Sequence, residues 1–456
     1  MPGMSSSTAC RVAVIGAGAA GLAAARALIL EGHDPVVLER EGRVGGTWVY
    51  TPETNSDPTG QDASRNAVHS SMYQSLRTNL PRELMGFREL PFLAGESWSG
   101  DARRFPGHEE VLRYLERFAE VFGIREVIRF GKEVVRARED GDGRWRVAWR
   151  NCENAEEEEV FDAVVVCSGH FAVPRLANIP GVEQFRGKQI HSHNYRTPHP
   201  FRDQVVVVIG ASSSAMDISQ DILGFAREVH IACRAANIDP FGKQPGCSNL
   251  WVHPMVERIC QDGNVLFLDG SSVHADVILH CTGYNYHFPF LETKGAVTVD
   301  EERVWPLYKH VFPPSYAPRL SFVGLIQKVL PFIQFELQSK WIAAALSGRV
   351  TLPSREDMNT NIQVFYARLE ANGVPKHHTH SMHLNSEDMF EYYDWLACEC
   401  GGKPIEEWRK RMWAKAAIII QAPSRLSKPR DLRNVPEEYE AYEEFAGCSP
   451  DAAPTT

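Results

Sequence analysis

A strand, a glycine-rich turn and a helix near the N-terminus constrain the fold of this chain more than any other feature. The stretch RVAVIGAGAAGLAAARAL starts as a β-branched strand, passes through GAGAAG and continues as an alanine-rich helix. In such a turn Gly16 permits the sharp bend, Gly18 lets the backbone approach a pyrophosphate, and Gly21 allows close helix packing. The next strand ends at Glu39, where an acid would bind ribose hydroxyls. The complete pattern favours a dinucleotide-binding βαβ unit over a glycine-rich turn of an ordinary α/β protein.

A second copy of this unit follows in the stretch VVVVIGASSSAMDIS. Gly210 keeps the turn, while Ser212 and Ala215 replace two glycines, which is acceptable if the dinucleotide lies slightly farther from the backbone. The run HIACR places Arg234 where the first unit has Glu39. A guanidinium there can grip a 2′-phosphate, so this unit should prefer NADPH over NADH. The alternative is that Arg234 is a surface cation at a strand end.

The two units predict an α/β protein with two Rossmann-like dinucleotide-binding domains. One acidic and one basic strand end imply two different nucleotides, so we expect FAD in the first unit and NADPH in the second. Gly45, Gly46, Thr47 and Trp48 could pass close to FAD, although by themselves they could equally form a loop. The NADPH domain should be inserted into the FAD domain. The predicted boundaries are 1–175 and 325–446 for the two parts of the FAD domain, 176–324 for the NADPH domain and 447–456 for a disordered tail.

Hydrophobic periodicity predicts the remaining elements. FPGHEEVLRYLERFAEVFG should form an amphipathic helix, and EVVRARE and RWRVAWR should form strands. The acidic NCENAEEEEVFD is expected to be a solvent-exposed hairpin or loop. SREDMNTNIQVFYARLEANG should form a helix that Ser354 caps.

Composition excludes several classes of protein. The chain has 456 residues, 43% of them hydrophobic, and a net charge of −10, which argues against a nucleic-acid partner. Its ten cysteines include no CxxC pair, so we expect reduced thiols in a cytoplasmic environment rather than a zinc knuckle or a secreted disulfide framework. No apolar run reaches the roughly 18 to 20 residues that cross a bilayer. We therefore expect no membrane span.

Two further motifs contain residues typical of metal or redox sites, but their spacing does not fit such a site. The histidines of KHHTHSMH, which are His377, His378, His380 and His383, lie in a loop without a nearby acidic or cysteine partner, so no metal site is expected. Cys398 and Cys400 are spaced poorly for a disulfide or a redox pair.

A flavin beside a nicotinamide implies hydride transfer, and the final electron acceptor then decides the class of enzyme. A disulfide reductase would need a redox CxxC, which this sequence lacks. Dioxygen remains as the acceptor.

At this point the sequence resembles the class B flavin-containing monooxygenases. FRGKQIHSHNY, with Phe185, Gly187, His191 and Tyr195, matches their FxGxxxHxxxY signature. SMYQSLRTNLPRELMGFRELPF is similar to the family's flavin-face segment, and CTGY is similar to its return-strand motif. Related Baeyer–Villiger enzymes have Trp where this chain has Tyr195, so the resemblance implies oxygenation of a heteroatom rather than insertion into a ketone.

The resemblance also implies a mechanism. NADPH would reduce FAD, O₂ would form a C4a-hydroperoxyflavin, and a soft nucleophile would take its distal oxygen, without a metal or a side-chain nucleophile. Asn79 matches the family asparagine beside the flavin and is the expected catalytic residue, because its amide can donate to the peroxide or to the nicotinamide ribose. Without the family match, Asn79 would be interpreted as a turn residue before Leu-Pro.

The expected cofactor contacts combine the glycine turns with these matches. For FAD they are Gly16, Ala17, Gly18, Ala19, Ala20, Gly21, Glu39, Arg40, Gly46, Thr47, Trp48, Thr78, Asn79 and Leu80. For NADPH they are Gly210, Ala211, Ser212, Ser213, Ser214, Ala215, Arg234, Cys281, Thr282 and Gly283, with His191 and Tyr195 in the signature loop.

Overall, the chain is similar to the plant S-oxygenating branch of the family, which includes enzymes of secondary metabolism. The resemblance implies that a small thioether and O₂ are the substrates and a sulfoxide the product. N-oxygenation of an amine is the alternative within the same chemistry, and an NADPH oxidase or electron-transfer flavoprotein is the alternative from another class. The sequence predicts no oligomeric state.

Overall fold

The computed structural model describes residues 9–62, 64–65, 68–95, 99–151, 153, 155–234, 241–382 and 386–421. The expected tail at 447–456 and His383 lie outside these residues.

The first module is built on a five-stranded parallel sheet. Its order is β22 (Leu320–Phe322), β7 (Ala163–Val166), β1 (Arg11–Ile15), β2 (Asp34–Leu38) and β3 (Ile128–Arg129). Because successive side chains of a strand point to opposite faces, Val12 and Val14 join the core under the helices, while Ala13 and Ile15 join a second core.

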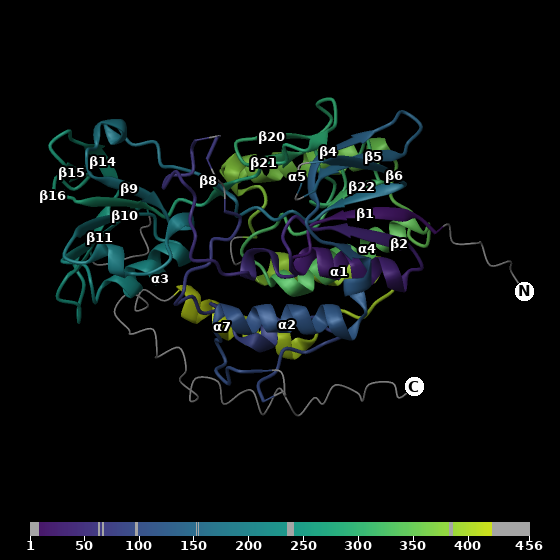
Figure 1. The fold of residues 1–456 in the computed structure, drawn as a ribbon, viewed down its shortest axis with the longest axis horizontal. Coiled ribbons are helices and arrows are strands. Elements are labelled where there is room, and N and C mark those ends of the chain that lie inside the picture. The colour runs from purple at the N-terminus through teal and green to yellow at the C-terminus, as the bar shows by residue number, and fades with distance from the viewer. Residues whose placement is uncertain are drawn as a thin grey trace, which may run out of the picture.

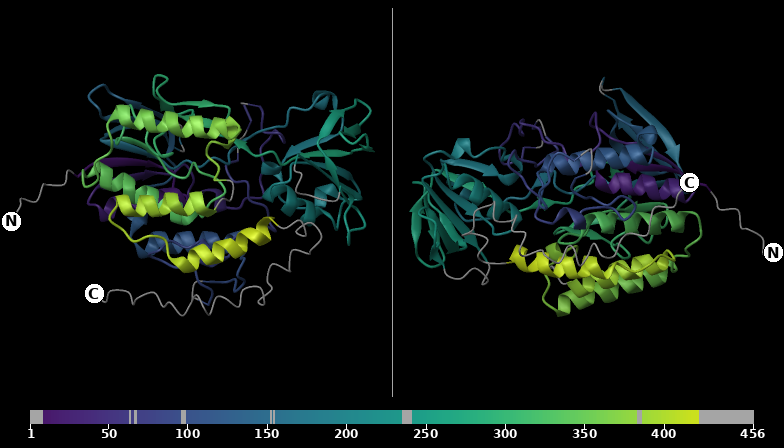
Figure 2. Two further views of the ribbon diagram at one scale, coloured as in Figure 1. Left: turned by 180° about the vertical axis from the view of Figure 1, so that it is seen from behind. Right: turned by 90° about the horizontal axis from the view of Figure 1, so that it is seen from below.

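Helices cover one face of this sheet and an antiparallel sheet covers the other (Figure 1). On the helical side α1 (Ala19–Leu30) packs on α4 (Pro331–Leu346), α4 on α6 (Ser386–Glu399), and α6 on α7 (Glu407–Gln421). These C-terminal helices are green to yellow in the views of Figure 2. The helices α2 (His108–Val121) and α5 (Arg355–Ala371) complete this module. The antiparallel sheet consists of β4 (Glu133–Glu139), β5 (Trp145–Arg150) and β6 (Glu156–Phe161), and β19 (Leu291–Glu292) adds a parallel edge strand beside β4.

The predicted acidic hairpin is confirmed and the loop alternative is wrong, because β6 (Glu156–Phe161) pairs antiparallel with β5 along its whole length while residues 156–158 stay exposed. Positive charges on β5 and just ahead of β4 explain why this run of glutamates forms a strand and not a loop. Glu158 lies 3.0 Å from Arg146, and Glu157 lies 2.9 Å from Lys132. Cross-strand ion pairs of this kind make a run of glutamates compatible with a sheet.

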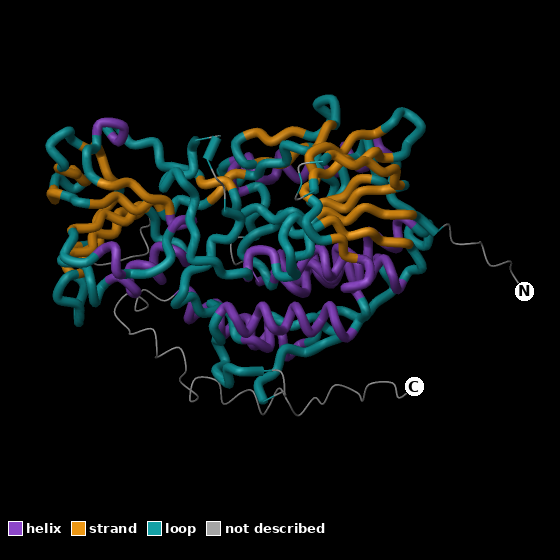
Figure 3. Tube along the Cα trace, viewed as in Figure 1, coloured by secondary structure: helices purple, strands orange, loops and turns teal. Residues whose placement is uncertain are grey.

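The second module repeats the three-layer arrangement around a six-stranded sheet, seen as the second group of strands in Figure 3. Its order is β12 (Gly242–Lys243), β13 (Leu250–Pro254), β11 (Glu228–Cys233), β10 (Val205–Ile209), β17 (Val277–His280) and β9 (Lys188–His191), and only the β12 pairing is antiparallel. The helix α3 (Ser213–Ile222) covers one face. The small sheet β14 (Val256–Ile259), β15 (Asn264–Phe267) and β16 (Ser272–His274) covers the other.

The chain leaves the first sheet after β7 and returns to it at β22. Every strand of the second sheet therefore comes between these two strands in the sequence. The short pair β8 (Val173–Pro174) and β18 (Tyr284–Asn285) ties the outgoing and returning segments together. A hairpin of β20 (Thr298–Asp300) and β21 (Arg303–Trp305) precedes the return. The predicted α/β class, with one Rossmann-like domain inserted into another, is confirmed.

The other predicted elements also agree with the structure. The amphipathic helix is α2, the two predicted strands are β4 and β5, and the helix that Ser354 should cap is α5. The Oγ of Ser354 accepts a hydrogen bond from the N–H of Asp357 at 3.1 Å, as an N-cap requires.

Candidate active site

The first glycine turn has no room for a side chain at Gly16 or at Gly21. Gly16 has a φ of +103°, and a Cβ there would lie 2.7 Å from the carbonyl oxygen of Cys167. A Cβ on Gly21 would lie 1.8 Å from the carbonyl oxygen of Gly16, because the first turn of α1 rests directly on the bend. Gly18 is the N-cap of α1 and provides no side-chain cap, so the N–H groups of the first helical turn, which includes Ala19 and Ala20, are available to an anion.

The segment after Glu39 closes over this turn. The N–H of Gly45 donates to the carbonyl of Ala17 at 3.1 Å, and a Cβ on Gly46 would lie 2.9 Å from the Cα of Gly18. Gly46, Thr47 and Trp48 form a 3₁₀ turn, and the buried Oγ1 of Thr47 has no hydrogen-bond partner among the described residues. Close backbone contact and an unpartnered buried hydroxyl fit a bound dinucleotide at this place.

Glu39 stands at the carboxyl end of β2, as predicted, and is 6% exposed. Its carboxylate accepts hydrogen bonds from the N–H of Ala17 at 2.6 Å and from the N–H of Glu41 at 2.8 Å. Burial raises the pKa of Glu39, while these two hydrogen bonds lower it. Each carboxylate oxygen keeps a further lone pair, so the group can fix the turn and still accept from a ribose hydroxyl. The neighbouring Arg40 is exposed and pairs with Glu41.

The second turn repeats the geometry of the first. Gly210 has a φ of +113°, and a Cβ there would lie 2.5 Å from the carbonyl oxygen of Cys281. After Ala211, Ser212 is the N-cap of α3 without a side-chain cap bond, and Ser213 begins the helix. Ser214 is exposed and Ala215 is fully buried in the core under the sheet.

The register of the strands corrects the predicted position of Arg234. Ile15 is level with Leu38 in the first unit, and Ile209 is level with Ala232 in the second. Cys233 is therefore the structural counterpart of Glu39, and Arg234 lies one residue farther. Arg234 is exposed just beyond the end of β11.

The CTGY motif packs against the second glycine turn and accepts hydrogen bonds from Arg175, a residue that the sequence did not single out. Cys281 leaves β17 behind Gly210, as Cys167 leaves β7 behind Gly16. The carbonyl of Thr282 accepts from both Nε and Nη2 of Arg175, at 3.1 and 2.9 Å, and the carbonyl of Gly283 accepts from the N–H of Arg175 at 3.0 Å. Pairing of β8 with β18 brings these residues together, which local sequence cannot show.

Asn79 lies where the two modules meet. Its Nδ2 is 3.4 Å from the Oγ of Ser213, the first residue of α3. Thr78 and Leu80 are buried on either side, and the Oγ1 of Thr78 donates to the carbonyl of Leu80 at 2.8 Å. The structure therefore brings an amide from the first module to the helix N-terminus of the second glycine turn.

The signature residues His191 and Tyr195 are buried between the modules. The Nδ1 of His191 accepts from the N–H of His193 at 3.0 Å. Burial, together with nearby His193 and His280, lowers the pKa of His191 to about 3, so this ring is neutral. Tyr195 is 1% exposed, its ring lies edge-on to Tyr73, and its hydroxyl donates to Asp221 on α3.

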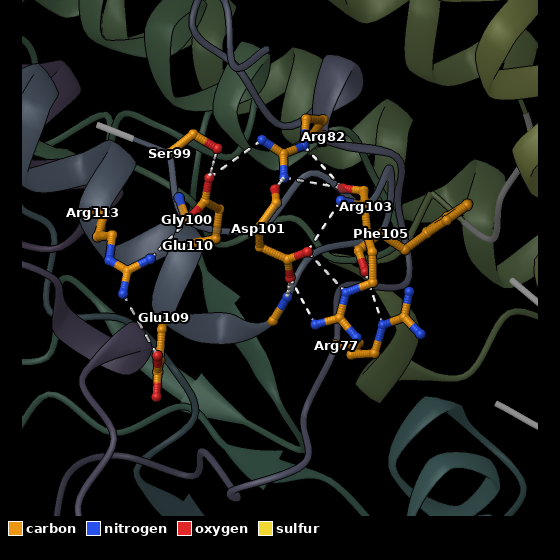
Figure 4. A network of polar contacts seen from close by, with 11 residues as sticks. Arg77, Arg82, Ser99, Gly100, Asp101, Arg103, Phe105, Glu109, Glu110 and Arg113 are labelled. Atoms are coloured by element: carbon orange, nitrogen blue, oxygen red, sulfur yellow. Dashed lines mark hydrogen bonds and ion pairs between the residues drawn. The ribbon is translucent and has the colours of Figure 1, made fainter. Parts of the chain in front are cut away.

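A polar network holds the segment that carries Asn79 from the other side (Figure 4). The Arg82 and Glu110 side chains form a buried ion pair at 3.4 Å, and Nε of Arg77 donates to the carbonyl of Phe105 at 2.9 Å. Burial alone would raise the pKa of Asp101, but hydrogen bonds from the Arg103 side chain and the N–H of Gly107 lower it.

A cavity of about 780 Å³ lies between this network and α3. It is lined by residues 74–77, 100–103, 107–110, Arg113 and Asp221, and by none of the predicted cofactor contacts.

The described residues support neither a metal site nor a membrane span. His380 is buried, with its Nδ1 at 3.0 Å from that of His310 and its Nε2 accepting from the N–H of Val304, while His377 and His378 form a separate turn. Within the described part of the chain, no group of three or more His, Cys, Asp or Glu side chains is arranged to hold a metal ion. Among the helices that the structure describes, none is long and apolar enough to cross a bilayer.

Comparison with known proteins gives consistent results. The model of the family described as flavin-binding monooxygenase-like matches residues 9–238 and 245–409. Flavin-containing monooxygenase FMO GS-OX-like 3 of Arabidopsis thaliana is 52% identical over 453 residues, covering 98% of this chain and 99% of the relative. Flavin-containing monooxygenase FMO GS-OX5 of the same plant is 54% identical over 400 residues, covering 87% of this chain and 86% of the relative.

Solved structures extend the agreement to three dimensions. The S-allyl-L-cysteine S-oxygenase of Allium sativum superimposes with a TM-score of 0.89 at 53% identity, covering 96% of this chain and 100% of that one. Tmm from Pelagibacter sp. strain HTCC7211 superimposes with a TM-score of 0.73 at 26% identity, covering 89% of this chain and 90% of that one. The comparisons confirm the resemblance, the enzyme class and the cofactors FAD and NADPH that the sequence predicted. This chain belongs to the flavin-binding monooxygenase-like family.

Proposed function

We propose that this chain uses NADPH and O₂ to oxygenate the sulfur of a small thioether, giving a sulfoxide. The observation that carries the proposal is the likeness to the S-allyl-L-cysteine S-oxygenase, at 53% identity over 96% of this chain. The GS-OX-like relatives cover nearly the whole chain at similar identity and support the same branch. The reaction is balanced: thioether, O₂, NADPH and one proton give sulfoxide, water and NADP⁺.

FAD is assigned to the first module and NADPH to the second. The first turn, from Gly16 to Gly21, with Glu39 and the 3₁₀ turn Gly46–Trp48, would hold the FAD. The second turn, from Gly210 to Ala215, would hold NADPH, with Arg234 reaching its 2′-phosphate. The assigned ranges are 1–175 and 325–446 for FAD and 176–324 for NADPH, which the insertion of one sheet into the other supports.

Asn79 is the residue to which we assign the chemistry. The reduced flavin supplies reactivity toward O₂, and the protein excludes water and donates hydrogen bonds to the oxygen that is transferred. The Asn79 amide is well placed for such a role, because it lies 3.4 Å from the first residue of α3, at the glycine turn assigned to NADPH.

A reducing, cytoplasmic compartment suits the chain. Burial raises the pKa of Cys167 and Cys281, so their thiols stay protonated and poorly reactive. No disulfide bond joins any of the cysteines that the structure describes.

Product analysis on a matched panel tests the proposal. Purified holoenzyme with NADPH in air is incubated with S-alkylcysteines, other small thioethers and tertiary amines, and products are identified by mass spectrometry. We expect sulfoxides from the thioethers. Oxygenation of amines alone would favour the N-oxygenase alternative, and H₂O₂ equal to the NADPH consumed, without any oxygenated product, would favour an oxidase.

A further inference from the structure

One face of α3 is joined to the segment that carries Asn79 by three polar contacts. Ser213, Asp217 and Asp221 are four residues apart, so they share a face of the helix. We call these three residues and their partners Asn79, Tyr73 and Ser75 the α3 seam. The contact distances are 3.4 Å from Asn79 Nδ2 to Ser213 Oγ, 3.5 Å from Tyr73 Oη to Asp217 Oδ2, and 2.6 Å from Ser75 Oγ to Asp221 Oδ2.

Asp221 is the point where three segments meet. Its Oδ2 accepts from the hydroxyl of Ser75 and from the hydroxyl of Tyr195, which lies in the signature loop. The Tyr195 ring also packs edge-on against Tyr73, with centroids 5.3 Å apart. One carboxylate oxygen thus links the Asn79 segment, the signature loop and the helix that begins the second glycine turn.

Because the seam is buried, it fits only one position of the Asn79 segment along α3. Asp217 is 5% exposed and Tyr73 is 4% exposed. A buried carboxylate is tolerated only where donors reach it, so sliding the segment along α3 would leave charged groups without partners. Moving the segment to the next set of equivalent positions on α3 would require a shift of one helical turn, about 5.4 Å. The seam therefore allows a single position of the Asn79 segment along α3.

The Asn79 segment is fixed independently on its other side. Arg77 bonds to the carbonyl of Phe105, and its backbone forms a bridge with Gly107 in the network at the start of α2. The open cavity separates this network from Asp221. The three hydrogen bonds of the seam join the Asn79 segment to α3, and Tyr73 and Leu76 also pack against the core to which α3 contributes Ala215 and Met216.

We propose that Asp221, supported by Asp217, is a positioning residue for hydride transfer. Through its hydrogen bonds with Ser75 and Tyr195, Asp221 fixes the position of the Asn79 segment along the axis of α3. The nucleotide at the N-terminus of α3 is thereby aligned with the flavin. This rests on the proposed assignment of NADPH to the second module. A reacting group misplaced by about 1 Å can lose roughly 100-fold in rate, so a loosened seam has a large effect without a direct contact to either cofactor.

The test compares holoenzymes of Asp221→Ala, Asp221→Asn and Tyr195→Phe with the wild type. Asp142→Asn is the matched control, because it removes a surface carboxylate that pairs only locally with Arg144 in a distant hairpin. Flavin reduction by saturating NADPH is followed without oxygen, per bound FAD. NADP⁺ affinity is measured by calorimetry, and hydrogen exchange is measured for residues 72–80.

We expect Asp221→Ala and Tyr195→Phe to slow reduction by about tenfold or more and to speed exchange in residues 72–80, and Asp221→Ala to change NADP⁺ affinity little. Asp221→Asn, which keeps one acceptor oxygen, should restore part of the rate. Wild-type reduction and exchange in both Asp221→Ala and Tyr195→Phe would overturn the proposal. If Asp221→Ala does not fold, Tyr195→Phe decides, since it removes only a hydroxyl.

The proposed function fails by a different result. A wild type that NADPH reduces but that oxygenates no thioether contradicts the substrate assignment and leaves the positioning result standing. A wild type that NADPH does not reduce contradicts the proposed function, while exchange in residues 72–80 still decides whether Asp221 holds the segment.

Discussion

Replacing Gly21 with alanine tests whether helix propensity or steric packing decides stability at the first glycine turn, because the two effects have opposite signs there. Gly21 lies within α1, where alanine is favoured over glycine by about 1 kcal/mol. The structure predicts the opposite sign, because the new Cβ would lie 1.8 Å from the carbonyl oxygen of Gly16. Relief requires a backbone shift of the turn or of the helix, since the contacting atom is not part of a side chain.

The expected loss follows from these two contributions. Overpacking of this kind lowers the free energy of unfolding by about 1 to 3 kcal/mol or more. We place Gly21→Ala at the upper end of this range because the new Cβ would meet backbone atoms of Gly16 and no movable side chain. The net change should be a loss of about 2 kcal/mol in the free energy of unfolding after the helix-propensity gain. The same shift disturbs the turn that would hold the pyrophosphate, so the purified variant should contain little FAD.

The second unit provides a matched control. Ala215 occupies the position equivalent to Gly21 and is fully buried without strain. Ala215→Gly should retain FAD and lose about 2 kcal/mol, the helix-propensity difference together with the loss of one buried methyl group, so FAD content separates the two variants. Urea unfolding and the flavin absorbance measure both effects. A Gly21→Ala protein that is as stable as the wild type and fully loaded with FAD would refute the packing argument.

Three further predictions concern the cofactor sites and pH. Asn79→Ala should abolish product formation while NADPH oxidation continues with release of H₂O₂; retained coupling would remove Asn79 from the assigned role. Arg234→Ala should weaken NADPH binding by about 10-fold or more, the value of a charge-assisted hydrogen bond, and leave NADH unchanged; calorimetry with both nucleotides checks this, and equal losses would contradict it. His191 is fully buried and its pKa is lowered to about 3, so the unfolded chain binds this proton first as the pH falls. Stability from His191 is therefore present above pH about 6.5 and is lost toward pH 3, by up to about 1.4 kcal/mol per pH unit. His191→Gln should make urea midpoints less sensitive to pH in this window, and an unchanged slope would count against a neutral buried ring.

Glycine requirements explain why much of the fold was predictable. Gly16 and Gly210 need positive φ and close backbone contact, which no other residue tolerates, so their spacing marks both turns directly in the sequence. The register was less predictable, because the end of a strand depends on its neighbours. Arg234 therefore lies one residue beyond the predicted place.

Contacts between distant segments account for what the sequence could not show. The strand Glu156–Phe161 depends on Arg146 of β5 and on Lys132, which precedes β4. Asp217 and Asp221 look like ordinary helix surface residues until Tyr73, Ser75 and Tyr195 are brought against them. Arg175 gains its partners only when β8 meets β18.

Labelled dioxygen gives the most direct test of the central claim that this chain transfers one oxygen atom from O₂ to sulfur. Holoenzyme with NADPH is supplied with isotopically labelled O₂ and S-allyl-L-cysteine, the compound named for the Allium sativum enzyme. The account predicts a sulfoxide that carries one labelled oxygen for each NADPH consumed. An unlabelled sulfoxide, or complete NADPH oxidation with no sulfoxide, would contradict it.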